Sequence, residues 1–182
     1  VDKAQSLIPY YYLPSKKNLE KQSLSIGKNV YQLLYFGQYE DSLNLAKLAV
    51  KMNSTDENLW LILSESQVAN KLYKDALISL NKAQKLNSKN SEIFFAKSRI
   101  LFKISQFNNA KTALASGLKL DPNNHKAIFQ LGNIFLMEKK YLEAVKLFDR
   151  SLEIKPDFWQ AINNQALAYF EKNNVNLSIK LF

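Results

Sequence analysis

A repeat of 34 residues is the feature that most constrains what this chain can fold into. Side chains of one kind recur at this interval along most of the 182 residues. One column is aromatic: Tyr39, Tyr73, Phe107 and Tyr141, with Val175 next. Three columns hold mainly small residues: the first is Ser42, Ala76, Ala110, Ala144 and Ser178, the second is Ala49, Ala83, Gly117 and Ser151, and the third is Val30, Ser64, Ser98, Gly132 and Ala166. A fifth column is large and apolar: Ile26, Trp60, Phe94, Ile128 and Ile162. Five columns with one period indicate tandem structural units.

The period predicts an N-terminal extended segment with a lead-in helix, 1–22, followed by one repeat domain, 23–182. Its units are 23–56, 57–90, 91–124, 125–158 and a partial 159–182. Within each unit, apolar residues recur at helical spacing in two runs. Proline ends the third and fourth units, at Pro122 and Pro156, because it lacks an N–H donor and disfavours helix in the preceding residue. Each unit is therefore predicted to be a helix–turn–helix.

Such a hairpin cannot bury its apolar face alone, so neighbouring hairpins must stack. The small columns allow the two helices of a hairpin to approach closely, and the large columns fill the space beside them. The predicted fold is an all-α solenoid.

The order Ile128, Leu131-Gly132, Phe135, Tyr141, Ala144, Phe148, Pro156 resembles the tetratricopeptide repeat (TPR) pattern, and the resemblance covers 23–182. It implies a right-handed superhelix whose concave face is lined by the first helix of each unit. Three departures are Ser54 and Ser88, where proline is usual, and Gln67 at an apolar position. The Lys- and Asn-rich character also resembles cyanobacterial and plastid TPR proteins that assist photosystem assembly.

The resemblance places positions 2, 5, 9, 12 and 13 of each unit on the concave face, and helical geometry puts them on one stripe. This stripe is apolar, which is typical of a binding site or a self-association face. Aromatic side chains with one arginine among them also match the composition of interface hot spots. The candidate peptide-binding residues are Tyr31, Tyr35, Phe95, Arg99, Phe102, Phe129, Asn133 and Phe170. The alternative is that some of these rings pack between adjacent helices as core.

One familiar TPR ligand is disfavoured. The resemblance implies that a clamp for a C-terminal carboxylate uses Lys and Asn on one first helix, Asn on the next, then Lys and Arg. Here Phe95 and Arg99 are followed by Asn133 and then by Asn163 with Leu167. No three consecutive units match that clamp.

The composition disfavours an enzyme, a metal site and a bound cofactor. The chain has no cysteine, four glycines and one histidine, His125, which is expected to be a solvated or capping residue at the surface. No nucleotide-binding or hydrolase motif occurs. The net charge is +9, but 23 of the 25 basic residues are lysine, and A/T-rich codons account for abundant Lys and Asn without any partner. RNA binding by helical repeats is a minor alternative.

The two ends of the sequence carry further expectations. Ile8–Pro14 holds three tyrosines between two prolines and reads either as a frayed tail or as an internal ligand, and Ser15 is placed to cap a helix from Lys16. Phe182 ends in mid-helix without a polar cap, so the natural chain continues or this end self-associates. The first residue is Val1, so an upstream signal or anchor is also conceivable; the location is left open between a cytoplasmic and a membrane-tethered domain of bacterial type.

Together these patterns predict a non-catalytic scaffold that binds a partner protein or peptide in an aromatic concave groove. The alternative function is a membrane-associated assembly factor, held by an N-terminal anchor, with lysines against anionic lipid.

Overall fold

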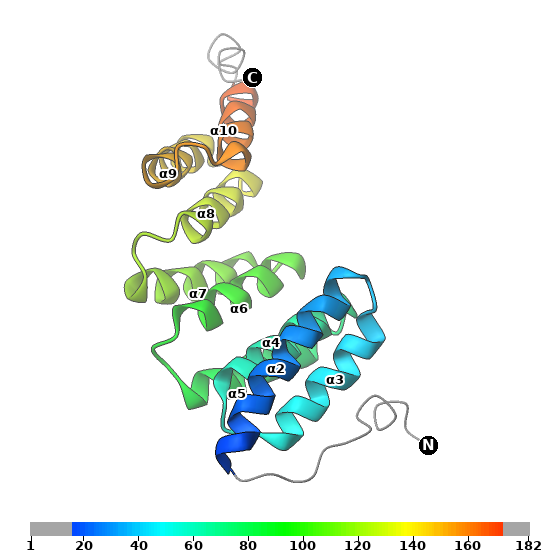
Figure 1. The fold of residues 1–182 in the computed structure, drawn as a ribbon. Helices are drawn as coiled ribbons and strands as arrows, with labels where there is room; N and C mark the ends of the chain where they lie inside the picture. Colours follow the sequence, from blue (N-terminus) through cyan, green and yellow to red (C-terminus); the bar gives the residue numbers. More distant parts are fainter. Residues whose placement is uncertain (1–15, 173–182) are drawn as a thin grey trace. The chain divides into compact units, whose positions relative to one another are not determined.

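The computed structural model describes residues 16–172, with side chains from residue 25 onward, and this part of the chain is built from helices alone (Figure 1). Contacts along the chain divide it into two compact units, 1–89 and 90–182, called here the N-terminal and C-terminal units. The boundary falls one residue before the predicted junction between the second and third repeats. The expectations for Tyr10–Tyr12, Ser15 and Phe182 lie outside the described residues.

The N-terminal unit contains four helices: α2 (Lys16–Tyr35), α3 (Tyr39–Met52), α4 (Glu57–Ala69) and α5 (Tyr73–Leu86). In sequence order each helix packs against the next, and α2 also packs against α4. This is the arrangement of two stacked hairpins in which the first helices lie side by side. Its core is formed by Ile26, Val30, Leu43, Ala46, Ala49, Val50, Leu59 and Leu63.

The described part of the C-terminal unit contains α6 (Ser91–Lys103), α7 (Phe107–Leu120), α8 (His125–Met137), α9 (Tyr141–Ile154) and α10 (Trp159–Glu171). Again each helix packs against the next, and α8, the first helix of the fourth repeat, contacts both α6 and α10. The three first helices α6, α8 and α10 therefore share one side of this unit.

The turn inside each hairpin has the same backbone geometry four times, at intervals of 34 residues. Gly37, Lys71, Ser105 and Lys139 all have φ between 59° and 73°, the left-handed region. Each donates its N–H to the carbonyl three residues earlier, and the next residue donates to the carbonyl five residues before it, as Lys139 and Lys140 do to Leu136 and Phe135. This pair of bonds is the Schellman motif, which satisfies carbonyls at a helix end. The sequence period is thus a period of the backbone itself.

The small columns are buried where the helices of a hairpin meet. Ala76, Ala110 and Ala144 are fully buried, and two glycines accept an aromatic ring from the facing helix. A Cβ atom at Gly117 would lie 2.4 Å from Cε1 of Phe95, and one at Gly132 would lie 2.6 Å from Cε1 of Phe148. Close packing of this kind leaves no room for even one added methyl group unless the ring moves.

The departures from the repeat pattern are accommodated locally. Gln67 is buried, and its Oε1 accepts a hydrogen bond from Ser79 Oγ at 2.7 Å. The carbonyl of Ser54 accepts from the indole Nε1 of Trp60 at 2.9 Å. A buried amide that is hydrogen-bonded is not a packing defect, so the second repeat keeps its fold despite the polar residue.

Candidate functional site

A cavity of about 610 Å³ lies within the C-terminal unit, on the side shared by its first helices. Its walls come from α6, α8 and the start of α10, so three successive repeats contribute to it. All lining residues belong to the C-terminal unit. The cavity is therefore a property of this unit by itself.

Four phenylalanine rings form the apolar part of the wall: Phe95, Phe102, Phe129 and Phe158. Phe129 meets Phe158 edge to face with ring centroids 5.0 Å apart, and Phe102 meets Phe107 at 5.5 Å. Contacts of this kind fix the ring orientations and hold an apolar wall in place. Phe95 is only 3% exposed, so its ring belongs to the core as well as to the wall.

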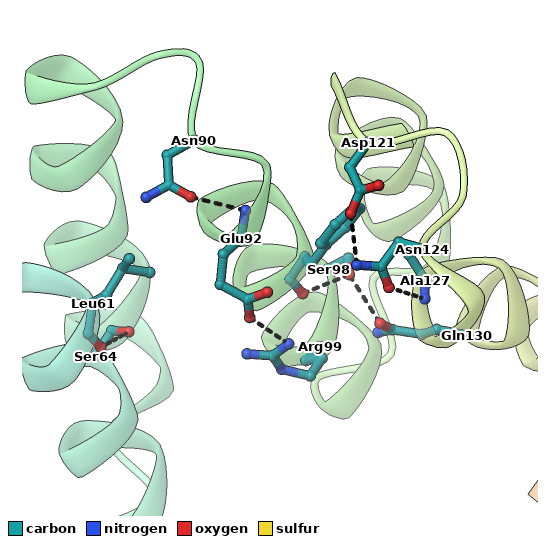
Figure 2. A network of polar contacts seen from close by, with 11 residues as sticks. Leu61, Ser64, Asn90, Glu92, Ser98, Arg99, Asp121, Asn124, Ala127 and Gln130 are labelled. Carbon is teal, nitrogen blue, oxygen red and sulfur yellow. Dashed lines mark hydrogen bonds and ion pairs between the residues drawn. The ribbon is translucent and has the colours of Figure 1, made fainter. Parts of the chain in front are cut away.

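The polar part of the wall is tied together by hydrogen bonds (Figure 2). Arg99 Nη1 lies 2.9 Å from Glu92 Oε1 and forms an ion pair with it. Ser98 Oγ donates to the Phe95 carbonyl at 2.8 Å, and Gln130 Oε1 lies 3.1 Å from the same hydroxyl. Both members of the ion pair are about half exposed, so the pair orients the guanidinium more than it stabilises the fold.

Asn133, one turn further along α8, is also positioned by a neighbour. Its Oδ1 accepts from Asn164 Nδ2 at 2.7 Å, which links α8 to α10 across the wall. The carbonyl end of this side chain is thus engaged within the protein. Contact with a ligand would fall to the amide Nδ2 of Asn133.

Two polar atoms of the wall are buried without a hydrogen-bond partner among the described residues: His125 Nε2 and Gln160 Oε1. The imidazole stands edge-on to Phe158 with ring centroids 5.0 Å apart. Burial lowers the pKa of His125 from its ordinary value, and the positive charges of Lys155 and Lys126 lower it further, against an opposing effect of Asp157. His125 is the first residue of α8 and is partly exposed, and the helix is capped by Asn124.

Phe158 occupies the position immediately before the first helix of its repeat, which holds a helix-capping residue in other repeats. The same position precedes the first helix in the other repeats, where Asp56, Asn90 and Asn124 accept a backbone N–H as N-caps. Asn124 Oδ1, for example, accepts from the Ala127 N–H at 3.0 Å. Phe158 makes no such bond at the start of α10 and is 8% exposed. The fifth repeat therefore has an aromatic residue that lines the cavity where the other repeats have an N-cap residue.

Five of the eight residues predicted from the sequence line this one cavity: Phe95, Arg99, Phe102, Phe129 and Asn133. Tyr31 and Tyr35 belong to the N-terminal unit, where Tyr35 is 85% exposed at the end of α2. Phe170 is 55% exposed near the end of α10 and does not line the cavity. The binding roles of all eight residues stay predictions.

The sequence analysis missed His125, Gln130, Phe158 and Gln160 as lining residues. For Phe158 a signal was present, because an aromatic residue interrupts a column of Asp and Asn. His125 is the first residue of its repeat and lies outside the stripe at positions 2, 5, 9, 12 and 13. Gln160 is at position 2 of its repeat, so it lies on the stripe, but it was not among the chosen residues.

A second cleft, of about 420 Å³, lies at the turn between α6 and α7 and includes Glu138. Glu138 accepts from Lys111 Nζ at 2.5 Å and from Lys140 Nζ at 2.9 Å, and these bonds lower the pKa of its carboxyl group. The negative charge of Glu138 is thus compensated within the protein by two lysines. Among the described residues, no group of His, Asp and Glu side chains is arranged to hold a metal ion.

A protein-family model matches the part of the chain that contributes most of the cavity wall. Residues 95–158 match the family model described as tetratricopeptide repeat. This segment is similar to the tetratricopeptide repeat family, and the match covers about a third of the chain. The matched segment contains most of α6 and all of α7, α8 and α9, so the cavity is lined mainly by TPR helices. No curated protein sequence matches the chain.

Solved TPR structures share the fold. The MamA protein is 22% identical, with a TM-score of 0.73 over 91% of this chain and 89% of MamA. YrrB, described as a TPR protein with an unusual peptide-binding site, is 21% identical, with a TM-score of 0.66 over 93% and 90%. PilF of Pseudomonas aeruginosa is 16% identical, with a TM-score of 0.82 over 90% and 75%. At these identities the likeness establishes the fold, an all-α TPR solenoid.

Proposed function

We propose that this TPR protein is an interaction module whose C-terminal unit binds a segment of a partner protein in the cavity between α6, α8 and α10. The observation that carries the proposal is the convergence of four phenylalanine rings and several oriented polar groups from three successive repeats on one cavity. TPR proteins are scaffolds for protein–protein interaction, and catalysis has no support in the motifs of this chain. A concave site with mostly apolar walls and a few placed polar groups is typical of a binding pocket.

Arg99 and Lys126 are the positively charged groups of the wall that would contact a bound segment. Arg99 uses only Nη1 in its contact with Glu92, and a guanidinium has five N–H donors, so others are available to a peptide carbonyl or carboxylate. Lys126 adds a second positive charge at the wall. The preferred segment would therefore place an apolar side chain among the rings with an acidic residue close by.

Selection of short random peptides against the full chain, followed by affinity measurement in solution, tests this proposal. The cavity variant is Arg99→Glu with Lys126→Glu. The matched control is Lys119→Glu with Lys146→Glu, which makes the same change in net charge at exposed positions on the second helices α7 and α9. The cavity variant is expected to weaken binding by about tenfold or more, while the control stays within about twofold of the parent.

The single histidine gives the location of binding directly. His125 lines the cavity, so its imidazole NMR signals should shift when a selected peptide binds. Peptides that bind equally well to both variants and leave these signals unmoved would show that the partner site lies elsewhere.

The membrane-associated assembly role stays a prediction, as does the narrower resemblance to photosystem assembly factors. No helix in the described part of the chain is both long and apolar enough to cross a membrane. Flotation of the full-length product with anionic and neutral liposomes tests the lipid contact. RNA binding is also untested; a steep salt dependence of binding to a homopolymer would support it.

A further inference from the structure

The second repeat presents a row of lysines that the other repeats lack. Along α5 and the segment just after it, exposed positions spaced by three or four residues hold Lys74, Ile78, Lys82, Lys85 and Lys89. Residues three or four apart lie on one face of a helix, so the members that belong to α5 form a single row. This surface, continued by Lys89, is called here the lysine stripe.

The lysine stripe faces away from the interior of the N-terminal unit. The helix α5 packs against α4, and its buried residues, none of which belongs to the stripe, are Ala76, Ser79, Leu80 and Ala83. Within the C-terminal unit, the equivalent positions of α7 and α9 are mostly exposed, although each of these helices packs against the first helix of the next repeat. Stacking of a further repeat therefore leaves such a face open.

The equivalent positions of the other repeats carry little net charge. They hold Glu40, Asn44, Leu48, Lys51 and Thr55 in the first repeat, Asn108, Thr112, Ser116, Lys119 and Asn123 in the third, and Leu142, Lys146, Arg150, Glu153 and Asp157 in the fourth. Basic and acidic residues balance in the first and fourth repeats, and the third has a single lysine. A/T-rich codons raise the number of lysines along the whole chain, but they do not gather them on one face of one helix.

The positive charges of the stripe are not compensated within the described part of the protein. None of its four lysines forms an ion pair with a described residue, whereas Lys111 and Lys140 both contact Glu138. Asp75 lies at the edge of the stripe, and Glu57 is engaged near the end of α5 by a hydrogen bond of 2.9 Å from Asn87 Nδ2. Like charges three or four residues apart destabilise a helix slightly, so the fold itself gains nothing from this row.

An apolar side chain lies among the lysines. Ile78 is 57% exposed, and the equivalent residues of the other complete repeats are Asn44, Thr112 and Lys146. Lysines around an exposed apolar residue suit the surface of an anionic bilayer, where ammonium groups contact the headgroups and the apolar side chain reaches the acyl boundary. A nucleic acid is held largely through arginine and aromatic side chains, and the stripe has neither.

We propose that the lysine stripe docks the protein on an anionic lipid surface, with α5 lying along the headgroups and Ile78 inserted between them. The stripe belongs to the N-terminal unit and the peptide-binding cavity to the C-terminal unit, so the proposal goes beyond the proposed function and does not depend on it. Attraction of this kind is reversible and weakens as salt screens the charges.

Vesicles of defined composition test the proposal with the full chain. The partition coefficient is measured by flotation with vesicles of phosphatidylcholine alone and with vesicles of equal parts phosphatidylcholine and phosphatidylglycerol. A lysine near an anionic surface contributes a factor of about five to binding, so we expect the mixed vesicles to bind at least about tenfold more tightly. Equal binding to both kinds of vesicle would overturn the proposal.

Charge reversal locates the contact. The stripe variant is Lys82→Glu with Lys85→Glu, and the matched control is Lys51→Glu with Lys119→Glu, which makes the same change in net charge at exposed residues equivalent to Lys85. Lysine and glutamate have similar helix propensities, and circular dichroism checks that both variants keep their helices. The stripe variant should lose about tenfold or more in partition to mixed vesicles, and the control should stay within about threefold of the parent. Equal losses would show that binding follows net charge, and the stripe would be excluded as the docking surface.

The apolar residue separates a lipid surface from other polyanions. Ile78→Asn copies the first repeat and should weaken binding to mixed vesicles by about fivefold, whereas Leu142→Asn, at an exposed position of α9, should leave it unchanged. An unaltered partition of Ile78→Asn would contradict insertion of this side chain. Polyuridylate binding that is tighter than vesicle binding and is lost in the stripe variant would assign the stripe to nucleic acid and overturn the lipid assignment.

Discussion

The two units share one backbone frame but differ in the side chains at the fifth position of the repeat. In the N-terminal unit this position holds Gly27 and Leu61; in the C-terminal unit it holds Phe95, Phe129 and, in the partial fifth repeat, Asn163. The hairpin turns are the same in both, with left-handed residues at intervals of 34. The frame therefore decides how helices stack, while a few positions on the first helices decide whether a ring-lined cavity forms.

The fifth position is matched to its partner on the second helix of the same hairpin. In the third repeat Phe95 packs against Gly117, and the equivalent positions of the second repeat hold Leu61 and Ala83. In the third repeat the ring of Phe95 occupies the space that a Cβ at Gly117 would need. A larger side chain on one helix has been accommodated by a smaller one on the other, and this complementarity can be tested by exchange.

The largest expected effect is on Gly117. Gly117→Ala places a methyl group 2.4 Å from the present position of Phe95 Cε1, although alanine fills the equivalent position in the N-terminal unit. Overpacking outweighs the better helix propensity of alanine, so the free energy of unfolding should fall by about 1–2 kcal/mol. Urea unfolding followed by circular dichroism measures the change.

Copying the second repeat should relieve the strain. Phe95→Leu with Gly117→Ala reproduces the Leu61–Ala83 pair and should cost less than the sum of the two single changes. Ala83→Gly, the reverse exchange in the N-terminal unit, is the control for helix propensity and should cost about 1 kcal/mol. Additive single and double changes would show that residues 95 and 117 are not coupled.

The comparison also explains what the sequence could predict. Periodicity predicted the helical hairpins, because they follow from positions that repeat along the chain. The TPR resemblance placed Phe95, Arg99, Phe102, Phe129 and Asn133 on the concave face; these five line the cavity, and their binding role stays a prediction. The burial of Phe95 was foreseen only as an alternative. The burial of Phe95 depends on the absence of a side chain at Gly117. It therefore depends on residues at two different repeat positions, which a search along one position does not reveal.

The residues that complete the cavity lie where the repeat departs from its own pattern. Phe158 replaces a cap residue, and its ring packs against the His125 imidazole. A search for similar residues at a fixed interval gives no weight to a residue that breaks the pattern. The contact between Phe158 and His125 joins two repeats, and no single repeat contains it.

The second effect in size concerns the left-handed turns. Gly37 occupies this position in the first repeat without strain, whereas Lys71 and Lys139 adopt the same geometry with a Cβ atom. Lys71→Gly and Lys139→Gly should each raise the free energy of unfolding by about 0.5–1 kcal/mol, and Gly37→Lys should lower it by about 1 kcal/mol. Thermal unfolding of the three variants gives the signs. A loss of stability in both Lys→Gly variants would contradict strain at these turns.

The smallest expected effect is a difference between the two units in how stability depends on pH. At the residue before the left-handed turn, the N-terminal unit has Asn70, whose amide donates to the carbonyls of Tyr39 and Ser66, and the C-terminal unit has Glu138. Hydrogen bonds from Lys111 and then Lys140 lower the pKa of Glu138. Its stabilisation is therefore present at neutral pH, above the unfolded pKa, and is lost as the pH falls through the lowered folded pKa.

Removal of the charge isolates this contribution. Glu138→Gln should lower the free energy of unfolding by about 0.5–1 kcal/mol at pH 7, with a smaller difference from the parent in acid. The parent and the variant share the titration of His125 and Asp149, so the difference between their pH profiles cancels those groups. Asn70, the equivalent residue of the second repeat, offers the matched control: its amide is uncharged, so Asn70→Ala should give a loss that is the same at both pH values. A Glu138→Gln deficit that does not shrink in acid would show that shape rather than charge holds this turn, and the two units would then differ there in packing alone.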